Sequence, residues 1–394
     1  MVLLGLFLAG LPLPAQSVWD VSRLRDVRAR YRAGERDEAS LLLMRNAERA
    51  LLQEPLSVMM KEGVPVSGDK HDYMSLARYF WPDPTKPDGL PYVNRDGVSN
   101  PELEKYDRNT LGRMASSVTT LSLAWYLSGD ERFAAKAVSL LRVWFLDEET
   151  RMNPHLKYAQ VARGHDGDRG RSYGLIDSYS FVEMLDAVQL LEKSRSFPRK
   201  DRKALRQWFS SFLDWYLESP QGQEEATAAN NHSVAYDVQA IAYALYIGWT
   251  KFAKEYIESF PARRILTQVE PDGSQPEELR RTLAFGYSQY NLSHMLDIRQ
   301  MALRLKIKLD DGPEGWERFF RGLDFLLPYA SGSTESWPYL QISDWQGKRQ
   351  AFCRDLYRTS LICPWRTDYR QFAVDHLDDN RSDLFSLLYF DASR

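Results

Sequence analysis

The stretch "NTLGRMASSVTTLSLAWYLSGDERFAAKAVSLLRVWFLD", from Asn109 to Asp147, indicates the fold of this chain more clearly than any other. Apolar residues recur three and four positions apart on both sides of the Ser-Gly-Asp turn at 128–130, which is the spacing of a helix face. A long helix that ends in a short turn and is followed at once by a second helix forms an antiparallel hairpin. The stretch therefore predicts two helices packed side by side.

The same pattern returns along the chain. It predicts helices at 176–194 and 199–219, at 230–248 and 250–269, and at 280–306 and 315–330, with a helical stretch at 20–52 and shorter helices near the C-terminus. Segments 55–105 and 151–174 are irregular and polar. No strict repeat period is present, which argues against a TPR or HEAT array. We therefore predict an all-α (α/α) toroid, an incomplete barrel of antiparallel helical hairpins with long loops lining a cleft or tunnel, in one domain at 18–394.

Composition narrows the class of partner. The 394 residues include 51 basic and 54 acidic side chains, well mixed, for a net charge of −3. The absence of a basic block argues against a nucleic-acid partner. Aromatic residues make up 13% of the chain. Most of them are expected to fill the core, although Trp and Tyr also stack on sugar faces.

The first residues, "MVLLGLFLAGLPLPAQS", form an apolar run that ends in small and polar residues. This pattern predicts a signal peptide over 1–17 and a protein exported to the periplasm or secreted. Pro12 and Pro14 interrupt the run, so stable membrane insertion is not expected. Cys353 and Cys363 could form a disulfide in an oxidising compartment, but we expect structural roles for them.

The stretch "ATAANNHSVAYDVQ", from Ala226 to Gln239, places polar side chains at the start of an apolar helix. One of Asn230 and Asn231 can cap the helix by accepting a hydrogen bond from a free backbone N–H. A cap does not explain the adjacent His232, so this site is a candidate for binding or catalysis.

Three further stretches combine side chains suited to chemistry. In "EPDGSQPEELRRTLAFGYSQYNL" (270–292), we expect one helix to carry Arg280, Arg281, Tyr287 and Tyr290, with Arg281 and Tyr287 on one broad side. The stretch "SGDKHDYMSLARYFWPDP" (67–84) supplies Lys70, His71, Tyr73, Tyr79 and Trp81. The stretch "RMNPHLKYAQ" (151–160) supplies Asn153, His155 and Tyr158, and Arg163, Arg169 and Arg171 follow it.

Neither a metal nor a cofactor is expected. The histidines lack the spacing of zinc ligands, no CxxC accompanies them, and no phosphate-binding loop occurs. A glycoside hydrolase would need two carboxylates flanking a cleft. Asp69, Asp72, Asp177 and Asp237 are candidates for that pair.

Taken together, the four stretches resemble the alginate lyase superfamily, polysaccharide lyases with an (α/α) toroid similar to families 5 and 38. The resemblance covers roughly residues 67–291, and the motifs occur in the family's order. It implies a lyase that cleaves (1→4)-linked uronic acid polymers by β-elimination, with alginate as the expected substrate. The implied partner is therefore an anionic polysaccharide.

The resemblance also implies roles for individual residues. Asn231, His232 and Arg281 would neutralise the substrate carboxylate, and Tyr287 would be the catalytic base and acid. His232 would take the proton in the epimer that presents it on the opposite face. Because an arginine nearby favours phenolate, we expect Arg281 to lower the pKa of Tyr287. Substrate contacts are expected from Lys70, His71, Tyr73, Trp81, Tyr158, Arg163, Asn230 and Arg280.

Three alternatives remain open at this point. The first is a glucuronan lyase of the same fold. The second is a toroid hydrolase that uses paired carboxylates. The third is a glycan-binding protein without catalysis, although such a protein would not need the His, Arg and Tyr set.

Overall fold

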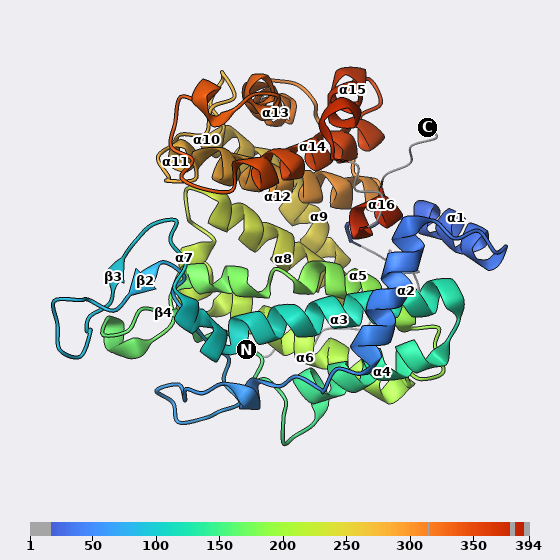
Figure 1. The fold of residues 1–394 in the computed structure, drawn as a ribbon, viewed down its shortest axis with the longest axis vertical. Coiled ribbons are helices and arrows are strands. Elements are labelled where there is room, and N and C mark those ends of the chain that lie inside the picture. The colour runs from blue at the N-terminus through green and yellow to red at the C-terminus, as the bar shows by residue number, and fades with distance from the viewer. Residues whose placement is uncertain (1–16, 314, 379–382, 390–394) are drawn as a thin grey trace.

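The computed structural model describes residues 17–313, 315–378 and 383–389, so most of the predicted signal peptide (1–17) lies outside the described residues. The architecture is all-α (Figure 1). The α-helices are α1 (Val21–Arg32), α2 (Glu38–Leu51), α3 (Asp107–Ser128), α4 (Glu131–Leu141), α5 (Phe181–Leu191), α6 (Arg199–Glu218), α7 (Pro220–Glu225), α8 (Asn231–Ile247), α9 (Thr250–Glu258), α10 (Leu266–Gln268), α11 (Pro276–Leu279), α12 (Ala284–Arg304), α13 (Glu317–Ala330), α14 (Trp345–Ile362), α15 (Thr367–His376) and α16 (Leu384–Leu388).

The helices form two layers, as the toroid prediction required. The inner layer runs α3, α5, α8, α12, α14, and each of these helices packs on the next, as Figure 1 shows. The outer helices α4, α9, α13 and α15 pack against α3, α8, α12 and α14, while α6 packs against α8. Near the ends of the described chain, α16 contacts α1 and α2.

Burial explains why the two layers differ in sequence. The inner helix α8 is buried on almost every side, which explains its continuous apolar run "IAYALYI". The outer helix α9 buries only Ala253 and Ile257, so it keeps the one-sided stripe of an amphipathic helix. The predicted turn at 128–130 is confirmed. Gly129 ends α3 with a φ of 79°, and the Asp130 side chain caps α4.

Some predicted boundaries were wrong. The C-terminal part was expected to hold shorter helices, but α14 has 18 residues; the helical stretch at 20–52 contains two helices, α1 and α2. The irregular segments are ordered by short strands: β1 (Met74–Leu76) pairs with β4 (Tyr158–Val161), and β2 (Phe80–Trp81) pairs with β3 (Val93–Asn94). Cys353 and Cys363 are both buried and free, so they form no disulfide. None of the described helices is long and apolar enough to cross a bilayer.

The N-terminal segment is attached to the core through a buried carboxylate on α5. Asp186 accepts hydrogen bonds from the backbone N–H groups of Ser17, Val18 and Trp19, at 2.5, 2.8 and 2.9 Å. Burial raises the pKa of Asp186 to about 6, although these hydrogen bonds oppose the shift. The segment therefore depends on a group that titrates close to neutrality.

This raised pKa predicts a pH-dependent stability. Between pH 3.8, the ordinary pKa of an aspartate side chain, and about pH 6, the native carboxyl holds a proton that the unfolded chain has released. The free energy of unfolding should therefore fall as pH rises through this window, by on the order of 3 kcal/mol. Asp186→Asn should lack this pH-dependent contribution. Urea titrations of both proteins at pH 4, 5, 6 and 7 give the difference between their free energies of unfolding, which should change with pH. A difference that stays constant over this range would contradict the prediction.

Candidate active site

A cleft of about 940 Å³ lies where α8 and α12 begin, beside the β2–β3 hairpin. In Figure 1 this is the end of the molecule at which β2, β3 and α7 gather. Its lining includes five cationic side chains, Arg78, Arg108, Arg171, Arg281 and Lys348, together with Asp96, Glu224, Glu225 and Asp344. An anionic ligand with sugar-like hydroxyls would find many partners here.

The start of α8 fixes three polar residues of the cleft. Asn230 is the N-cap, and its side chain accepts a hydrogen bond from the His232 backbone N–H at 3.1 Å. The Asn231 backbone and side chain donate to the two oxygens of Glu278, at 2.6 and 2.8 Å. The cap predicted for one asparagine is therefore Asn230, while Asn231 is held in place by a buried carboxylate.

His232 is held through one ring nitrogen. Its Nδ1 lies 2.7 Å from Oε1 of Glu225, the last residue of α7. The side chain of His232 is 21% exposed and that of Glu225 only 3%. Both residues line the cleft. A carboxylate can only accept a hydrogen bond, so Nδ1 carries the proton and Nε2 is left for other partners.

Arg281 and Tyr287 meet inside the cleft. The Arg281 guanidinium donates to the Tyr287 hydroxyl at 2.9 Å and to the Asp96 carboxylate at 2.7 Å. It also lies 4.0 Å from the centre of the Tyr287 ring. The Tyr79 hydroxyl is 2.8 Å from the Tyr287 hydroxyl. Tyr287 Oη therefore has two close polar neighbours that can donate hydrogen bonds to it.

The prediction that Arg281 and Tyr287 share one helix was wrong. The helix α11 stops at Leu279, and α12 begins only at Ala284. Arg281 lies in the connection, where Leu283 bridges to Gln341. Its contact with Tyr287 is thus made by a bend of the chain, which places the two side chains closer than a helix face would.

Arg281 does lower the pKa of Tyr287 as expected, but other effects outweigh it. Burial raises the pKa of Tyr287 well above its ordinary value, the Tyr79 hydroxyl raises it further, and Arg281 opposes this without overcoming it. Burial raises the pKa of Asp96 as well, but hydrogen bonds from Arg281 and Thr282 outweigh it and the net pKa is lowered. Tyr287 is therefore a neutral phenol in the free cleft, and Asp96 is ionised.

Seven of the predicted substrate-binding residues are absent from the described lining of the cleft: Lys70, His71, Tyr73, Trp81, Tyr158, Arg163 and Arg280. Tyr73 is fully buried, and its hydroxyl donates to Asp177 at 3.0 Å. Direct substrate contact by Tyr73 is ruled out in this conformation because no part of it is accessible.

The other members of that group have local partners. The His71 ring contacts the Arg151 carbonyl at 2.7 Å, and the Trp81 indole donates to the Val98 carbonyl at 2.9 Å. Arg280 forms an ion pair with Glu277 on the surface. Of the predicted binding residues, Asn230 lies in the cleft.

The carboxylates considered for a hydrolase do not line the cleft within the described residues. Asp177 is buried and accepts hydrogen bonds from Ser75 and Gln160, at 2.5 and 2.9 Å. Asp237 is fully buried, and Asp72 binds Asn153 at 2.7 Å. These acids are engaged in structure, so they are not a carboxylate pair that flanks the cleft.

Several cleft residues were missed by the sequence reasoning. Asp96, Arg108 and Glu225 belong to no recognisable spacing, because each comes from a different segment. Gln160 was quoted as the last residue of "RMNPHLKYAQ" (151–160) but was not singled out. In the structure it adopts a φ of 52°, which is rare for a residue other than glycine and is often found at functional sites.

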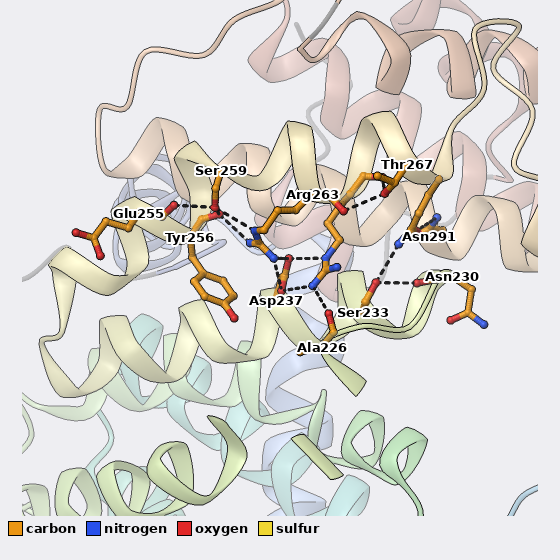
Figure 2. A network of polar contacts seen from close by, with 12 residues as sticks. Ala226, Asn230, Ser233, Asp237, Glu255, Tyr256, Ser259, Arg263, Thr267 and Asn291 are labelled. Atoms are coloured by element: carbon orange, nitrogen blue, oxygen red, sulfur yellow. Dashed lines mark hydrogen bonds and ion pairs between the residues drawn. The ribbon is translucent and has the colours of Figure 1, made fainter. Parts of the chain in front are cut away.

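A buried ion-pair network supports the start of α8 (Figure 2). Asp237 binds Arg263 at 3.0 Å and Arg264 at 2.8 Å. Arg264 also donates to the carbonyl of Ala226 at 2.8 Å, next to Glu225. The network therefore fixes the connection between α7 and α8, from which Glu225 and His232 both extend.

Comparison with known proteins finds similarity to alginate lyases. A family model described as alginate lyase matches residues 57–337. The crystal structure of an alginate lyase from Bacteroides ovatus is 44% identical, with a TM-score of 0.92, and the match covers 95% of this chain and 99% of that one. Alginate lyase A1-III from Sphingomonas species A1 is 13% identical, with a TM-score of 0.55 over 97% and 100% of the two chains, which shows the fold alone. A search of curated proteins gives no match.

Proposed function

The chain belongs to the alginate lyase family and is a polysaccharide lyase, and from this premise we propose that it cleaves (1→4)-linked uronic acid polymers, with alginate as the substrate. The observation that carries the proposal is the contact of Arg281 with Tyr287 in a cleft that His232 and Asn231 also line. The five cationic side chains of the lining suit a polymer with one carboxylate on every sugar, although four carboxylates also line the cleft.

The reaction is a β-elimination. The C5–H bond breaks, its electrons form the C4=C5 double bond, and the C4–O4 bond breaks with its electron pair remaining on O4. The proton on C5 is weakly acidic while the adjacent carboxylate is charged. Hydrogen bonds from Arg281 and Asn231 to this carboxylate would stabilise the negative charge that develops on it in the transition state. His232 is not counted among these donors, because its Nδ1–H is directed to Glu225.

The protonation state of Tyr287 favours one assignment of acid and base. A neutral phenol can donate its proton to the departing O4 directly, so Tyr287 is the acid. The Nε2 atom of His232 is the base that takes the C5 proton when that proton lies on the imidazole face of the sugar. For the other epimer, Tyr287 would have to act as base. Arg281 and Tyr79 would then donate hydrogen bonds to the phenolate.

The test is the product itself. Each cleavage creates an unsaturated sugar end that absorbs in the ultraviolet, so polymannuronate, polyguluronate and glucuronan should be supplied separately. We expect absorbance to rise with at least one alginate polymer. A signal from glucuronan alone would favour the glucuronan alternative, and new saturated reducing ends without absorbance would indicate hydrolysis.

Arg281→Lys is expected to reduce kcat/KM by roughly 10²-fold. Lysine keeps the positive charge but cannot contact Tyr287, Asp96 and a substrate carboxylate in one plane. Steady-state kinetics on the preferred polymer measures the loss. A matched control is Arg280→Lys, since Arg280 is the adjacent arginine but pairs with Glu277 on the surface. If the two substitutions reduced kcat/KM equally, the role assigned to Arg281 would be wrong.

We also propose that the protein is exported, on the basis of the apolar run that opens the sequence. N-terminal sequencing of the protein recovered from outside the cytoplasm should then start near residue 18, after the predicted signal peptide (1–17). A protein that begins at Met1 there would contradict the proposal.

A further inference from the structure

Glu225 is a buried carboxylate in the wall of the cleft. Only 3% of its side chain is exposed. Among the described residues, the only hydrogen bond or ion pair of its carboxylate is with Nδ1 of His232, at 2.7 Å. A carboxylate that loses this much water is costly unless it is hydrogen-bonded or paired with a positive charge. The contact with His232 is therefore central to how the cleft is built.

The chain fixes Glu225 from both sides. Gly222, on the same short helix α7, approaches Tyr216 so closely that an added Cβ would lie 1.8 Å from its carbonyl oxygen. On the other side, Arg264 holds the Ala226 carbonyl at 2.8 Å. This clamping leaves the carboxylate little freedom to turn away from the imidazole.

The carboxylate has two separable effects on the ring. As an acceptor it holds the proton on Nδ1, so that Nε2 keeps its lone pair. As a negative charge it stabilises the imidazolium that would form when Nε2 takes a proton. The carboxylate of Glu278 is occupied by the backbone and side chain of Asn231, so it cannot replace Glu225 in the first role.

We infer that Glu225 is a positioning residue that keeps His232 ready to act as a base, and that it thereby sets how well the enzyme handles the uronate epimer whose C5 proton faces His232. The inference rests on the proposed lyase function. It concerns one of the two epimers because the other would lose its C5 proton to Tyr287. Glu225 does not touch the substrate in this scheme and acts through His232.

The experiment compares Glu225→Gln with wild type on polymannuronate and polyguluronate. The amide retains the size and one acceptor oxygen but has no charge, and it can turn its NH2 group towards Nδ1. We expect a loss in kcat of roughly 10²-fold on one polymer and less than about threefold on the other. His232→Gln should identify the same polymer as the sensitive one, and the double variant should be no worse than His232→Gln alone.

Glu224→Gln is the matched control. It removes the same charge from the neighbouring position, where the exposed side chain also faces the cleft. Glu224→Gln should change kcat on both polymers by the same small factor. If Glu225→Gln changes kcat in the same way as Glu224→Gln, or lowers kcat equally on both polymers, the inference is wrong.

A spectroscopic measurement separates positioning from a folding defect. In protein with ¹⁵N-labelled histidine, His232 of wild type should show a protonated Nδ1 and an unprotonated Nε2, and Glu225→Gln should show a mixture of tautomers. The signal is assigned by its absence in His232→Gln, one of six histidines. An unchanged tautomer in Glu225→Gln would overturn the inference. A wild type that gave no unsaturated product on any uronan would instead refute the lyase function itself.

Discussion

Tyr287→Phe should abolish turnover, with a fall in kcat of at least about 10³-fold, while the affinity for polymer stays within a few-fold. The substitution removes one hydroxyl and keeps the ring, which lies 4.0 Å from the Arg281 guanidinium. Both proposed routes use this hydroxyl to protonate O4, so neither epimer should escape the loss. Ultraviolet assays give kcat, and calorimetric titration of the inactive variant with polymer gives Kd.

Tyr290→Phe is the control for that result. Tyr290 lies about one turn further along α12 and also lines the cleft, but its ring packs on His294 with centroids 4.1 Å apart. We expect it to lower kcat by less than about tenfold. If Tyr287→Phe kept activity near that of wild type, Tyr287 could not be the proton donor, whatever the behaviour of Tyr290.

Asp237→Ala should have the largest effect on stability. The carboxylate is fully buried and binds both Arg263 and Arg264, so its removal leaves guanidinium charge without its partner. Breaking a buried ion pair in this way costs about 3–5 kcal/mol. With an unfolding entropy of about 2.1 cal/mol/K per residue, a chain of this length would melt about 4–6 °C lower. Calorimetry of wild type and variant measures the shift.

Glu255→Ala separates this effect from the loss of any acidic residue nearby. Glu255 pairs with Lys251 on the exposed face of α9 at 3.8 Å, and it appears in the same region of Figure 2. Exposed pairs contribute about 0–1 kcal/mol, so its melting temperature should shift by at most about 1 °C. Equal shifts for the two variants would show that the Asp237 network does not stabilise the fold.

Asp237→Ala should also reduce activity at temperatures where the protein is still folded. Arg264 would lose the carboxylate that orients it, and with it a fixed contact to the Ala226 carbonyl. The connection that carries Glu225 and His232 would then be free to move. A variant that melts early yet keeps full kcat at 25 °C would contradict this coupling.

The sequence by itself determined the helical architecture and identified the candidate site residues. Helix spacing and the Ser-Gly-Asp turn are local properties, so the hairpin of α3 and α4 could be predicted from 109–147 alone. Asn231, His232, Arg281 and Tyr287 were found because each lies in a stretch that resembles a family motif. Their presence in one cleft agrees with that prediction.

Only the tertiary structure decided what surrounds those residues. Asp96 comes from the segment after β3 and Glu225 from the end of α7. The contact of Asp96 with Arg281 joins residues far apart in the chain, and no periodicity reports such a contact. Tyr73 is the opposite case. It lies in a stretch that resembles a family motif and was predicted to bind substrate, but its side chain is buried in the core.

The protonation state of Tyr287 also belongs to the folded protein. A neighbouring arginine in the sequence suggested a lowered pKa, but the net pKa is raised, because burial and the Tyr79 hydroxyl outweigh Arg281. Desolvation depends on everything packed around a group, and charge pairing depends on which partners arrive from other segments. Sequence therefore specified which side chains could react, and packing specified the charge that each one carries before the substrate binds.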